Sequence, residues 1–510
     1  IRERVMAKGD LPVLVGVGQS LSQWDGTSGA DGAPSPLSLM VDASRAALSD
    51  SGADLSKAID TIAVVRIFED SVGGAPHPHG HNTNLPGTLA RDIGAAPDTL
   101  IYETVGGQSP QALVNEMAAR IHAGDADCVL ISGSEANRAS KGARRNNVEI
   151  NWADGADVDY EDRGMGPMML SREEIKHGIV APAYFYGLFE NAIAAREGHS
   201  RSQHRKAMAE LFQPFSVVAA KNPYSQFPEE RSVEFLSTPS KANYEYADPF
   251  LKWFIAQDAV NQGAAAILMS SSKADALGVP EDKRVYLHGA GEAADDLISL
   301  RPRLDGSWAM QTAIDRALDQ AAKATGDIKH LDLYSCFPCA VFSSTAALGI
   351  DWKNDPRPLT LTGGLPFFGG PGNNYSLHGI AEMVSTLRAD PGSYGLVLAN
   401  GGWMTKEAVG IYSTQKPTRF APAESYATPT EQVTLCGEDC EGTLETFTVT
   451  HGKEGPNKGI AFVRLEDGRR ALAVASPAAL ATLREDASPV GRKVAVSVDT
   501  EKERGTFSFI

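Results

Sequence analysis

The sequence predicts an α/β protein in which two similar halves form the core and a small all-β domain follows them. Three observations lead to this expectation. Apolar strand segments alternate with amphipathic helices over most of the chain, a pattern typical of parallel βαβ units. The order of these elements repeats once after residue 283. Beyond residue 429, short alternating strands separated by turn residues replace the helices.

The first half is predicted over residues 10–136 and 258–283. PVLVGV, at residues 12–17, has the continuous apolar character of a buried strand. Ser35 and Pro36 then begin an amphipathic helix, because serine is a preferred N-cap and proline is favoured in the first turn. The remaining strands of this half are IDTIAVVRIF, DCVLISGSE and NQGAAAILMSSS.

The regular pattern lapses over residues 137–257. Segments such as NRASKGARRNN and DGADVDYEDRGMG are charged and rich in loop-forming residues, and only a few helical stretches, such as RSQHRKAMAELF, separate them. Because the α/β pattern resumes at residue 258, we interpret this stretch as an insertion into the first half.

The second half is predicted over residues 284–413. It reads as the strand KRVYLHGAG, the helix SWAMQTAIDRALDQAAKATG, the strand HLDLYSCF, the helix around LHGIAEMVSTLRAD and the strand YGLVLANGG. This last strand is similar to DCVLISGSE in the first half, since both are apolar, end in small residues and follow an amphipathic helix. Two fused βαβ halves are the simplest account of this similarity.

A linker and a β domain are predicted to complete the chain. Residues 414–429 are rich in proline, threonine and alanine, a composition typical of linkers. Residues 430–510 contain strands of period two between turn residues, and we expect them to fold as a unit, as a barrel or an open sheet. The predicted strands are GTLETFTVTHG, KGIAFVRLEDG, RRALAVAS, GRKVAVSVDT and GTFSFI.

Composition excludes several classes of function. The chain has 510 residues, of which 42% are hydrophobic and 22% charged, as expected for a globular protein with a large core. Its formal net charge of −17 argues against a general nucleic-acid binder. No apolar run reaches the length of a transmembrane helix, and the first residues lack a signal-peptide pattern, so we expect a cytoplasmic protein.

The segment YETVGGQSPQA, residues 102–112, predicts a strand that turns sharply into a helix. Many α/β enzymes place a nucleophile at such an elbow, where the N-terminus of the helix favours negative charge. Here the turn contains no cysteine. Its only hydroxyl, that of Ser109, is expected to cap the helix before Pro110.

Four segments in order resemble the thiolase superfamily, and most closely its sterol-carrier-protein type. They are the elbow with Gln111 and Ala112, FSVVAAKNPYSQF, AQDAVNQGAAAILMSSSKADALG and LTGGLPFFGGPG. The resemblance implies a duplicated five-layer α-β-α-β-α core with residues 137–257 as an inserted loop domain. The terminal β domain resembles the OB-fold domains that accompany such thiolases. Family members are usually homodimers, and the fused domain leaves a monomer open.

The resemblance also implies that the usual catalytic positions are altered. Thiolases use a cysteine nucleophile on the elbow, an oxyanion donor, a histidine and a second cysteine for Claisen chemistry. In this sequence the nucleophile position falls on Gly106 and the oxyanion donor on Tyr334. The histidine position falls on Gly370 and the second cysteine on Ala399. We therefore expect that the fold was kept and the Claisen reaction was lost.

Other residues could supply a relocated active site. Cys336 and His378 both belong to segments that face the family's pocket, and they are the candidates for a Cys–His pair. Alternatively, Cys336 is a buried apolar residue and His378 faces solvent.

Basic residues in the insertion could bind the phosphates of CoA or acyl-CoA, the expected ligand, since the family's loop domain holds CoA. Alternatively, these side chains only solvate exposed helix faces. The candidates are Arg144, Arg145, Arg201, Arg205 and Lys206.

No metal and no covalently bound cofactor are expected. The CxxC and CxxxC motifs lack a second pair at zinc-ribbon spacing. The histidines of APHPHGHN lie in a Pro/Gly-rich loop without acidic or cysteine neighbours, so a solvated loop is favoured. The residues concerned are Cys336, Cys339, Cys436, Cys440, His77, His79 and His81.

Two functions remain open from the sequence. One is a catalytically silent protein of the acetyl-CoA acetyltransferase family that binds CoA or acyl-CoA. The other is an acyltransferase or thioesterase with the relocated pair. The altered positions favour the first, and the glycine-rich loops are compatible with both.

Overall fold

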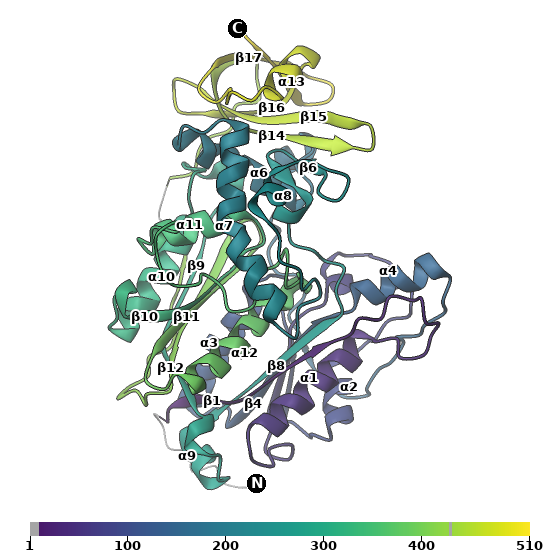
Figure 1. Cartoon of the computed structure of the whole chain (residues 1–510), viewed down its shortest axis with the longest axis vertical. Helices are drawn as coiled ribbons and strands as arrows, with labels where there is room; N and C mark the ends of the chain where they lie inside the picture. The colour runs from purple at the N-terminus through teal and green to yellow at the C-terminus, as the bar shows by residue number, and fades with distance from the viewer. Residues whose placement is uncertain (1–9, 428–430) are drawn as a thin grey trace.

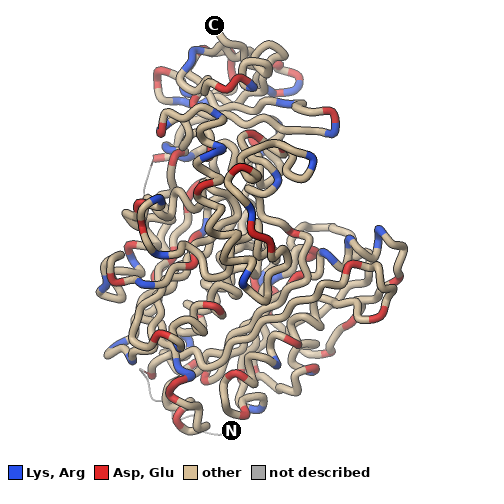
Figure 2. The backbone as a smooth tube through the Cα atoms, viewed as in Figure 1, with Lys and Arg blue, Asp and Glu red and all other residues tan. Residues whose placement is uncertain are grey.

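The computed structural model describes residues 10–427 and 431–510. The α/β core forms one end of an elongated molecule and the C-terminal β domain forms the other (Figure 1). Acidic and basic residues are interspersed in both parts (Figure 2). Residues 428 and 429 of the predicted linker and residue 430 of the predicted β domain lie outside the described residues.

The first half contributes one side of the core sheet. Strands β2, β3 and β4 run parallel, and β8 runs antiparallel to both β4 and β1. The strand order is β3-β2-β4-β8-β1. These strands are continuous apolar runs with few exposed positions, as expected for strands covered on both faces. Their bounds are β1 Pro12–Leu21, β2 Thr61–Val64, β3 Thr99–Tyr102, β4 Cys128–Glu135 and β8 Gln262–Ser270.

The second half repeats this arrangement. Its strand order is β10-β11-β12-β9, with β10 and β11 parallel and β12 antiparallel to both of its neighbours. The four strands therefore correspond to β2, β4, β8 and β1, which confirms the predicted duplication. Their bounds are β9 Val285–Ala294, β10 Ile328–Leu333, β11 Tyr394–Gly401 and β12 Lys406–Ser413.

The helices complete the predicted five layers. Two helices, α3 and α12, lie between the sheets and contact strands of both halves, and their apolar side chains form a common buried core. The outer faces are covered by α1 and α2 on the first half and by α10 and α11 on the second. The bounds are α1 Pro36–Asp50, α2 Leu85–Ile93, α3 Ser109–Ala123, α10 Trp308–Ala321, α11 Pro338–Ala347 and α12 Tyr375–Ala389.

The two sheets meet at one edge. Val13 pairs with Tyr286 and Leu14 with Val285, so a short contact between β1 and β9 joins the halves into one hydrogen-bonded sheet. At the end of the first half, α9 (Ser271–Ala276) follows β8 directly and is capped by the Ser270 hydroxyl.

The insertion is divided between two neighbours and is not one separate domain. Helix α4 (Asn137–Asn146) packs its alanines against Trp24 of the first half, and β5 (Glu161–Asp162) extends that half's sheet beside β3. By contrast, α6 and α7 belong to the core cluster of the second half. The remaining bounds are α5 Arg172–Lys176, α6 Pro182–Arg196, α7 Arg201–Lys221, α8 Val233–Ser237, β6 Glu245–Ala247 and β7 Phe250–Leu251.

The C-terminal domain is a closed barrel of five strands. The pairing runs β14-β15-β16-β18-β17 and returns to β14, with only β16 and β18 parallel. The predicted all-β domain is thus confirmed, with one short helix, α13, between β16 and β17. The bounds are β14 Cys440–Gly452, β15 Gly455–Arg464, β16 Arg470–Ala475, α13 Pro477–Leu483, β17 Lys493–Asp499 and β18 Arg504–Phe509.

The barrel contacts the rest of the protein through the insertion. Strands β6 and β7 of the insertion extend its sheet, with Thr450 opposite Ala247. Helix α6 packs against β14, and the buried Thr448 hydroxyl of β14 donates to the carbonyl of Asp248 between β6 and β7. The linker also contacts the core, because its strand β13 (Ser425–Ala427) pairs with β9. Within the described residues, no helix has both the length and the apolar character needed to cross a membrane.

Candidate functional site

A cavity of about 490 Å³ lies between the elbow, the loops of the second half and the insertion. Gly106, Tyr334 and Gly370, three of the four positions that the family resemblance singled out, line it. The fourth, Ala399, is buried in β11, and its neighbour Asn400 lines the cavity instead.

The elbow has no room for a side chain. The Gly106 amide donates to Oδ1 of Asn373 at 3.1 Å, and its φ of +153° is one that favours glycine. A Cβ at Gly107 would lie 2.3 Å from the Tyr334 hydroxyl and 2.5 Å from the Asn400 carbonyl oxygen. The tyrosine at the oxyanion-donor position therefore requires glycine opposite it.

The start of α3 differs from the prediction. Ser109 is the first helical residue and not the N-cap, because its hydroxyl donates to the carbonyl of Thr104 at 3.1 Å. Gln108 takes the cap position without a capping side-chain bond. Its Oε1 is buried and has no hydrogen-bond partner among the described residues.

Three polar side chains from different elements meet at the cavity wall. Asn400 donates from Nδ2 to the hydroxyl of Tyr186 at 3.0 Å, and the same Nδ2 lies 3.7 Å from Sγ of Cys336. The Tyr186 hydroxyl in turn donates to the carbonyl of Gly402 at 3.1 Å. Oδ1 of Asn400 is buried without a partner in the described part of the chain, so it can accept a hydrogen bond from a ligand.

Burial keeps these groups uncharged. It raises the pKa of the Cys336 thiol to about 12, so the cysteine is a neutral thiol near pH 7. Burial also raises the pKa of Tyr186 well above its usual value. Glu407, opposite Asn400 across β11 and β12, is fully enclosed, and burial raises its pKa well above the ordinary range. The part of the cavity wall formed by Cys336, Tyr186 and Asn400 therefore offers hydrogen bonds rather than charge.

The structure does not bring His378 to Cys336, which corrects the predicted pair. His378 lies on α12 between the two sheets, is fully buried, and does not line the cavity. Its Nδ1 is 2.7 Å from Oε1 of Gln19, and its ring packs against Phe368. Burial lowers its pKa to about 3, so it remains a neutral core side chain.

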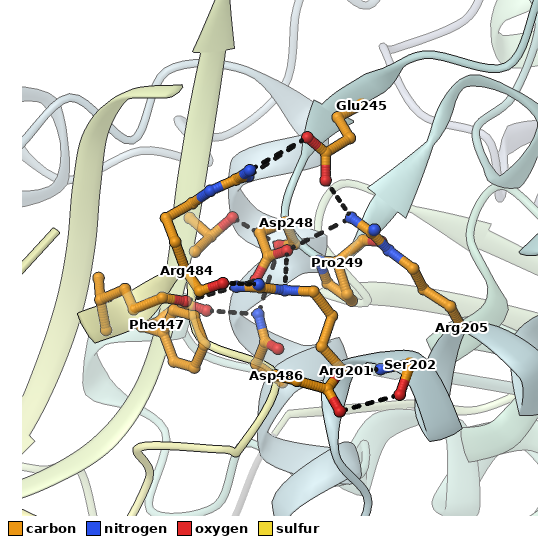
Figure 3. A network of polar contacts seen from close by, with 12 residues as sticks. Arg201, Ser202, Arg205, Glu245, Asp248, Pro249, Phe447, Arg484 and Asp486 are labelled. Carbon is orange, nitrogen blue, oxygen red and sulfur yellow. Dashed lines mark hydrogen bonds and ion pairs between the residues drawn. The ribbon is translucent and has the colours of Figure 1, made fainter. Parts of the chain in front are cut away.

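Two of the predicted phosphate-binding arginines are engaged where the insertion meets the barrel (Figure 3). Arg201 pairs with the buried carboxylate of Asp248, with 2.8 Å between Nε and Oδ1, and donates to the carbonyls of Leu483 and Arg484. Arg205 donates to Glu245 at 2.8 Å. Both arginines lie on α7, and their charges are neutralised by the carboxylates of Asp248 and Glu245.

The other three predicted basic residues are also distant from the cavity lining. Arg144 and Arg145 are exposed at the end of α4. Lys206 is exposed on α7, with Glu210 at 3.8 Å as its neighbour. None of these residues lines the cavity, nor does Arg201 or Arg205.

A different lysine borders the cavity. Lys252 lines it beside Trp253, and the guanidinium of Arg231 lies 3.6 Å from the centre of the same indole ring. Burial and the nearby Arg231 charge lower the pKa of Lys252. Arg231 is already paired with Glu229 at 2.9 Å, so the positive charge offered to an anionic ligand at this cavity is that of Lys252. Neither Lys252 nor Arg231 was predicted from the sequence, because each stands outside any basic run.

Comparison with known proteins decides the family. The family described as thiolase-like protein type 1 additional C-terminal domain matches residues 422–501. A crystal structure of a monomeric SCP2-thiolase-like protein type 1 from Mycobacterium smegmatis is 39% identical, with a TM-score of 0.81, over 98% of this chain and 99% of that chain. The chain belongs to the SCP2-thiolase-like protein type 1 family. The resemblance to thiolases expected from the sequence is thereby confirmed.

More distant structures resemble this SCP2-thiolase-like protein in fold alone. The acetyl-CoA acetyltransferase from Syntrophomonas wolfei is 16% identical, with a TM-score of 0.56, over 80% of this chain and 100% of that chain. The Ltp2-ChsH2(DUF35) aldolase is 17% identical, with a TM-score of 0.57, over the same shares of both chains. No curated protein sequence matches the chain significantly.

Proposed function

We propose that this SCP2-thiolase-like protein binds CoA or acyl-CoA without forming an acyl-enzyme, and that it lacks ordinary thiolase activity. The observation that carries the proposal is the cavity at the elbow, which combines the space for a ligand with uncharged hydrogen-bonding side chains and one lysine in its wall. Its volume lies in the range of small-molecule sites, roughly 300–1,000 Å³.

The wall suits an acyl thioester. Oδ1 of Asn400, which has no partner among the described residues, can accept a hydrogen bond from a pantetheine amide N–H, and Phe337 and Trp403 provide apolar surface for the acyl and pantetheine chains. Lys252 is the one Lys or Arg among the described residues that line this cavity, and we assign to it a contact with the CoA phosphates.

Claisen chemistry has no agent in this arrangement. Gly106 cannot form an acyl-enzyme, and neither Gly370 nor Ala399 offers an acid or base. The alternative function, an acyltransferase or thioesterase with a Cys336–His378 pair, loses its support because His378 is enclosed between the sheets. A neutral buried thiol without a base is a poor nucleophile.

Calorimetry and an activity assay test the proposal together. CoA and acetyl-CoA should bind the full-length protein at one site, while acetoacetyl-CoA should not be cleaved above the background rate. Lys252→Ala should weaken CoA binding about tenfold by removing a phosphate contact. The matched control, Lys206→Ala, removes an exposed lysine and should leave binding unchanged. Thiolysis at thiolase-like rates, or no binding at millimolar CoA, would refute the proposal.

We further propose that the protein is a cytoplasmic monomer with an OB-type barrel. The Mycobacterium smegmatis relative is described as monomeric, and the barrel's pairing order follows the five-stranded OB pattern. Light scattering coupled to size exclusion checks the oligomeric state, and a mass near 108 kDa instead of 54.2 kDa would contradict it.

A further inference from the structure

Three side chains outside the cavity converge in the loop between β2 and α2. Asp70 belongs to the short helix η1 (Phe68–Ser71), and His77 and His81 lie in the following loop. Nε2 of His77 is 2.9 Å and Nε2 of His81 is 3.1 Å from the same oxygen, Oδ1 of Asp70. One ligand atom from each of the three residues lies within 4.8 Å of the other two.

These separations suit a small divalent cation. Zinc bonds to histidine nitrogen and carboxylate oxygen are about 2.0–2.2 Å, which places the ligands of a tetrahedral site roughly 3.3 Å apart. The imidazole rings lie only 4.0 Å apart, between centroids. Two protonated imidazoles at that distance would repel each other, whereas two neutral imidazoles can bind one metal ion without that cost.

The loop conformation selects two of its three histidines. The His77 carbonyl accepts from the Gly80 amide at 3.1 Å, and Gly80 has a φ of +89°, so the chain turns back between the two histidines. His79 lies elsewhere, with its Nε2 3.1 Å from the hydroxyl of Ser140 and its ring against Trp152. Only His77 and His81 therefore reach Asp70.

The carboxylate is oriented by a buried neighbour. The Tyr102 hydroxyl donates to Oδ2 of Asp70 at 2.5 Å, which leaves Oδ1 directed at the two histidines. Tyr102 is itself fixed, because its oxygen accepts from the Ile67 amide at 3.3 Å. A second hydrogen bond that orients a ligating carboxylate is typical of metal sites.

A hollow gives access to the cluster. A hollow of about 260 Å³ is lined by Asp70, His77 and His81 together with Glu69 and Tyr160. A water molecule can therefore reach an ion bound by the first three side chains. We propose that Asp70, His77 and His81 bind one Zn²⁺ ion with water as the fourth ligand. Two neutral nitrogen ligands and one carboxylate match the donors that zinc prefers.

The proposed ion would tie the loop to the wall of the ligand cavity. Phe68, two residues before Asp70 on η1, lines that cavity. Asn373, which accepts from the Gly106 amide, donates to the Ser71 hydroxyl at the end of η1. Zinc binding should therefore raise the melting temperature of the full-length protein.

The test is a titration of tag-free, chelator-treated full-length protein with Zn²⁺, followed by calorimetry. We expect one ion per chain, and Co²⁺ should give the visible absorption bands of a four-coordinate site. His77→Ala and His81→Ala should each weaken Zn²⁺ binding about 100-fold. His330→Ala is the matched control, because it removes another histidine paired with an aspartate, Asp390, at 2.8 Å.

The results of this titration either support the zinc site or overturn it. Circular dichroism of the metal-free variants establishes that each has folded, and Asp70→Asn provides a third ligand change of nearly the same size. Binding of one Zn²⁺ that all three ligand variants weaken, and the control does not, supports the site. No binding at micromolar Zn²⁺, or equal weakening in His330→Ala, would overturn it.

Discussion

Replacing Arg201 with alanine should loosen the barrel without affecting the ligand cavity. Arg201 is the main counter-charge of Asp248, whose side chain is 1% exposed, and it also donates to two barrel carbonyls (Figure 3). Removing one member of a buried ion pair typically costs 3–5 kcal/mol, because the other charge is left uncompensated. Arg205 remains 3.6 Å from Asp248, so we expect a loss of about 3 kcal/mol, at the lower end.

Hydrogen exchange measures this loss where it occurs. If the barrel opens locally, about 3 kcal/mol corresponds to roughly 100-fold faster exchange of the β14 amides, while amides of the β4 core strand should be unaffected. Lys206→Ala on the same helix is the control, because the ion pair that Lys206 makes with Glu210 within the described residues is exposed and is worth less than about 0.5 kcal/mol.

The same variant separates a structural role from phosphate binding. Arg201→Ala should bind CoA as the unmodified protein does, since Arg201 does not line the cavity. Unchanged β14 exchange together with a loss of CoA affinity would refute the reasoning and restore Arg201 as a phosphate ligand.

Three further predictions concern the cavity and the strand pair behind it. Gly107→Ala places a Cβ 2.3 Å from the Tyr334 hydroxyl, so it should lower the free energy of unfolding by about 1–3 kcal/mol and weaken CoA binding. The control is Gly326→Ala, whose Cβ would meet nothing within 4 Å and which should have neither effect. Burial raises the pKa of the Cys336 thiol to about 12, so near pH 8 it should react with iodoacetamide about 1,000-fold more slowly in the native than in the urea-unfolded protein. Mass spectrometry measures both reaction rates, and equal rates would contradict this. Burial raises the pKa of Glu407, so the folded state retains a proton that the unfolded state releases above about pH 4.3. The free energy of unfolding should therefore fall as the pH rises from about 4.3 toward the pKa of Glu407 in the folded state. Glu407→Gln should remove this fall, and parallel stability curves for the two proteins between about pH 4 and 9 would show that Glu407 is already ionised.

The core could be predicted because its signals are local and repeated. The strands at 128–135 and 394–401 are long apolar runs, each preceded by an amphipathic helix, and the order of elements occurs twice. The same local alternation identified the five barrel strands. In contrast, β6 and β7 have only three and two residues, too few to show a period, and the strand they join lies about 200 residues further along the chain.

The candidate site was harder to predict because burial decided it. His378 could not be placed from its spacing, since α12 is covered by sheets on both sides and therefore has no polar face to separate from an apolar one. The arginines of RSQHRK look like an exposed basic run, but Arg201 faces a barrel that is distant in sequence. Asp70 lies seven residues before His77 in an irregular segment, where no periodicity indicates contact.

A crystal structure of the full-length protein soaked with acetyl-CoA would test the central claim most directly. We predict an intact thioester in the cavity at the elbow, with a pantetheine amide N–H within hydrogen-bond distance of Oδ1 of Asn400, its phosphates near Lys252, and no covalent bond to the protein. An acetyl group attached to Cys336, or CoA bound elsewhere with the cavity free of it, would contradict the account.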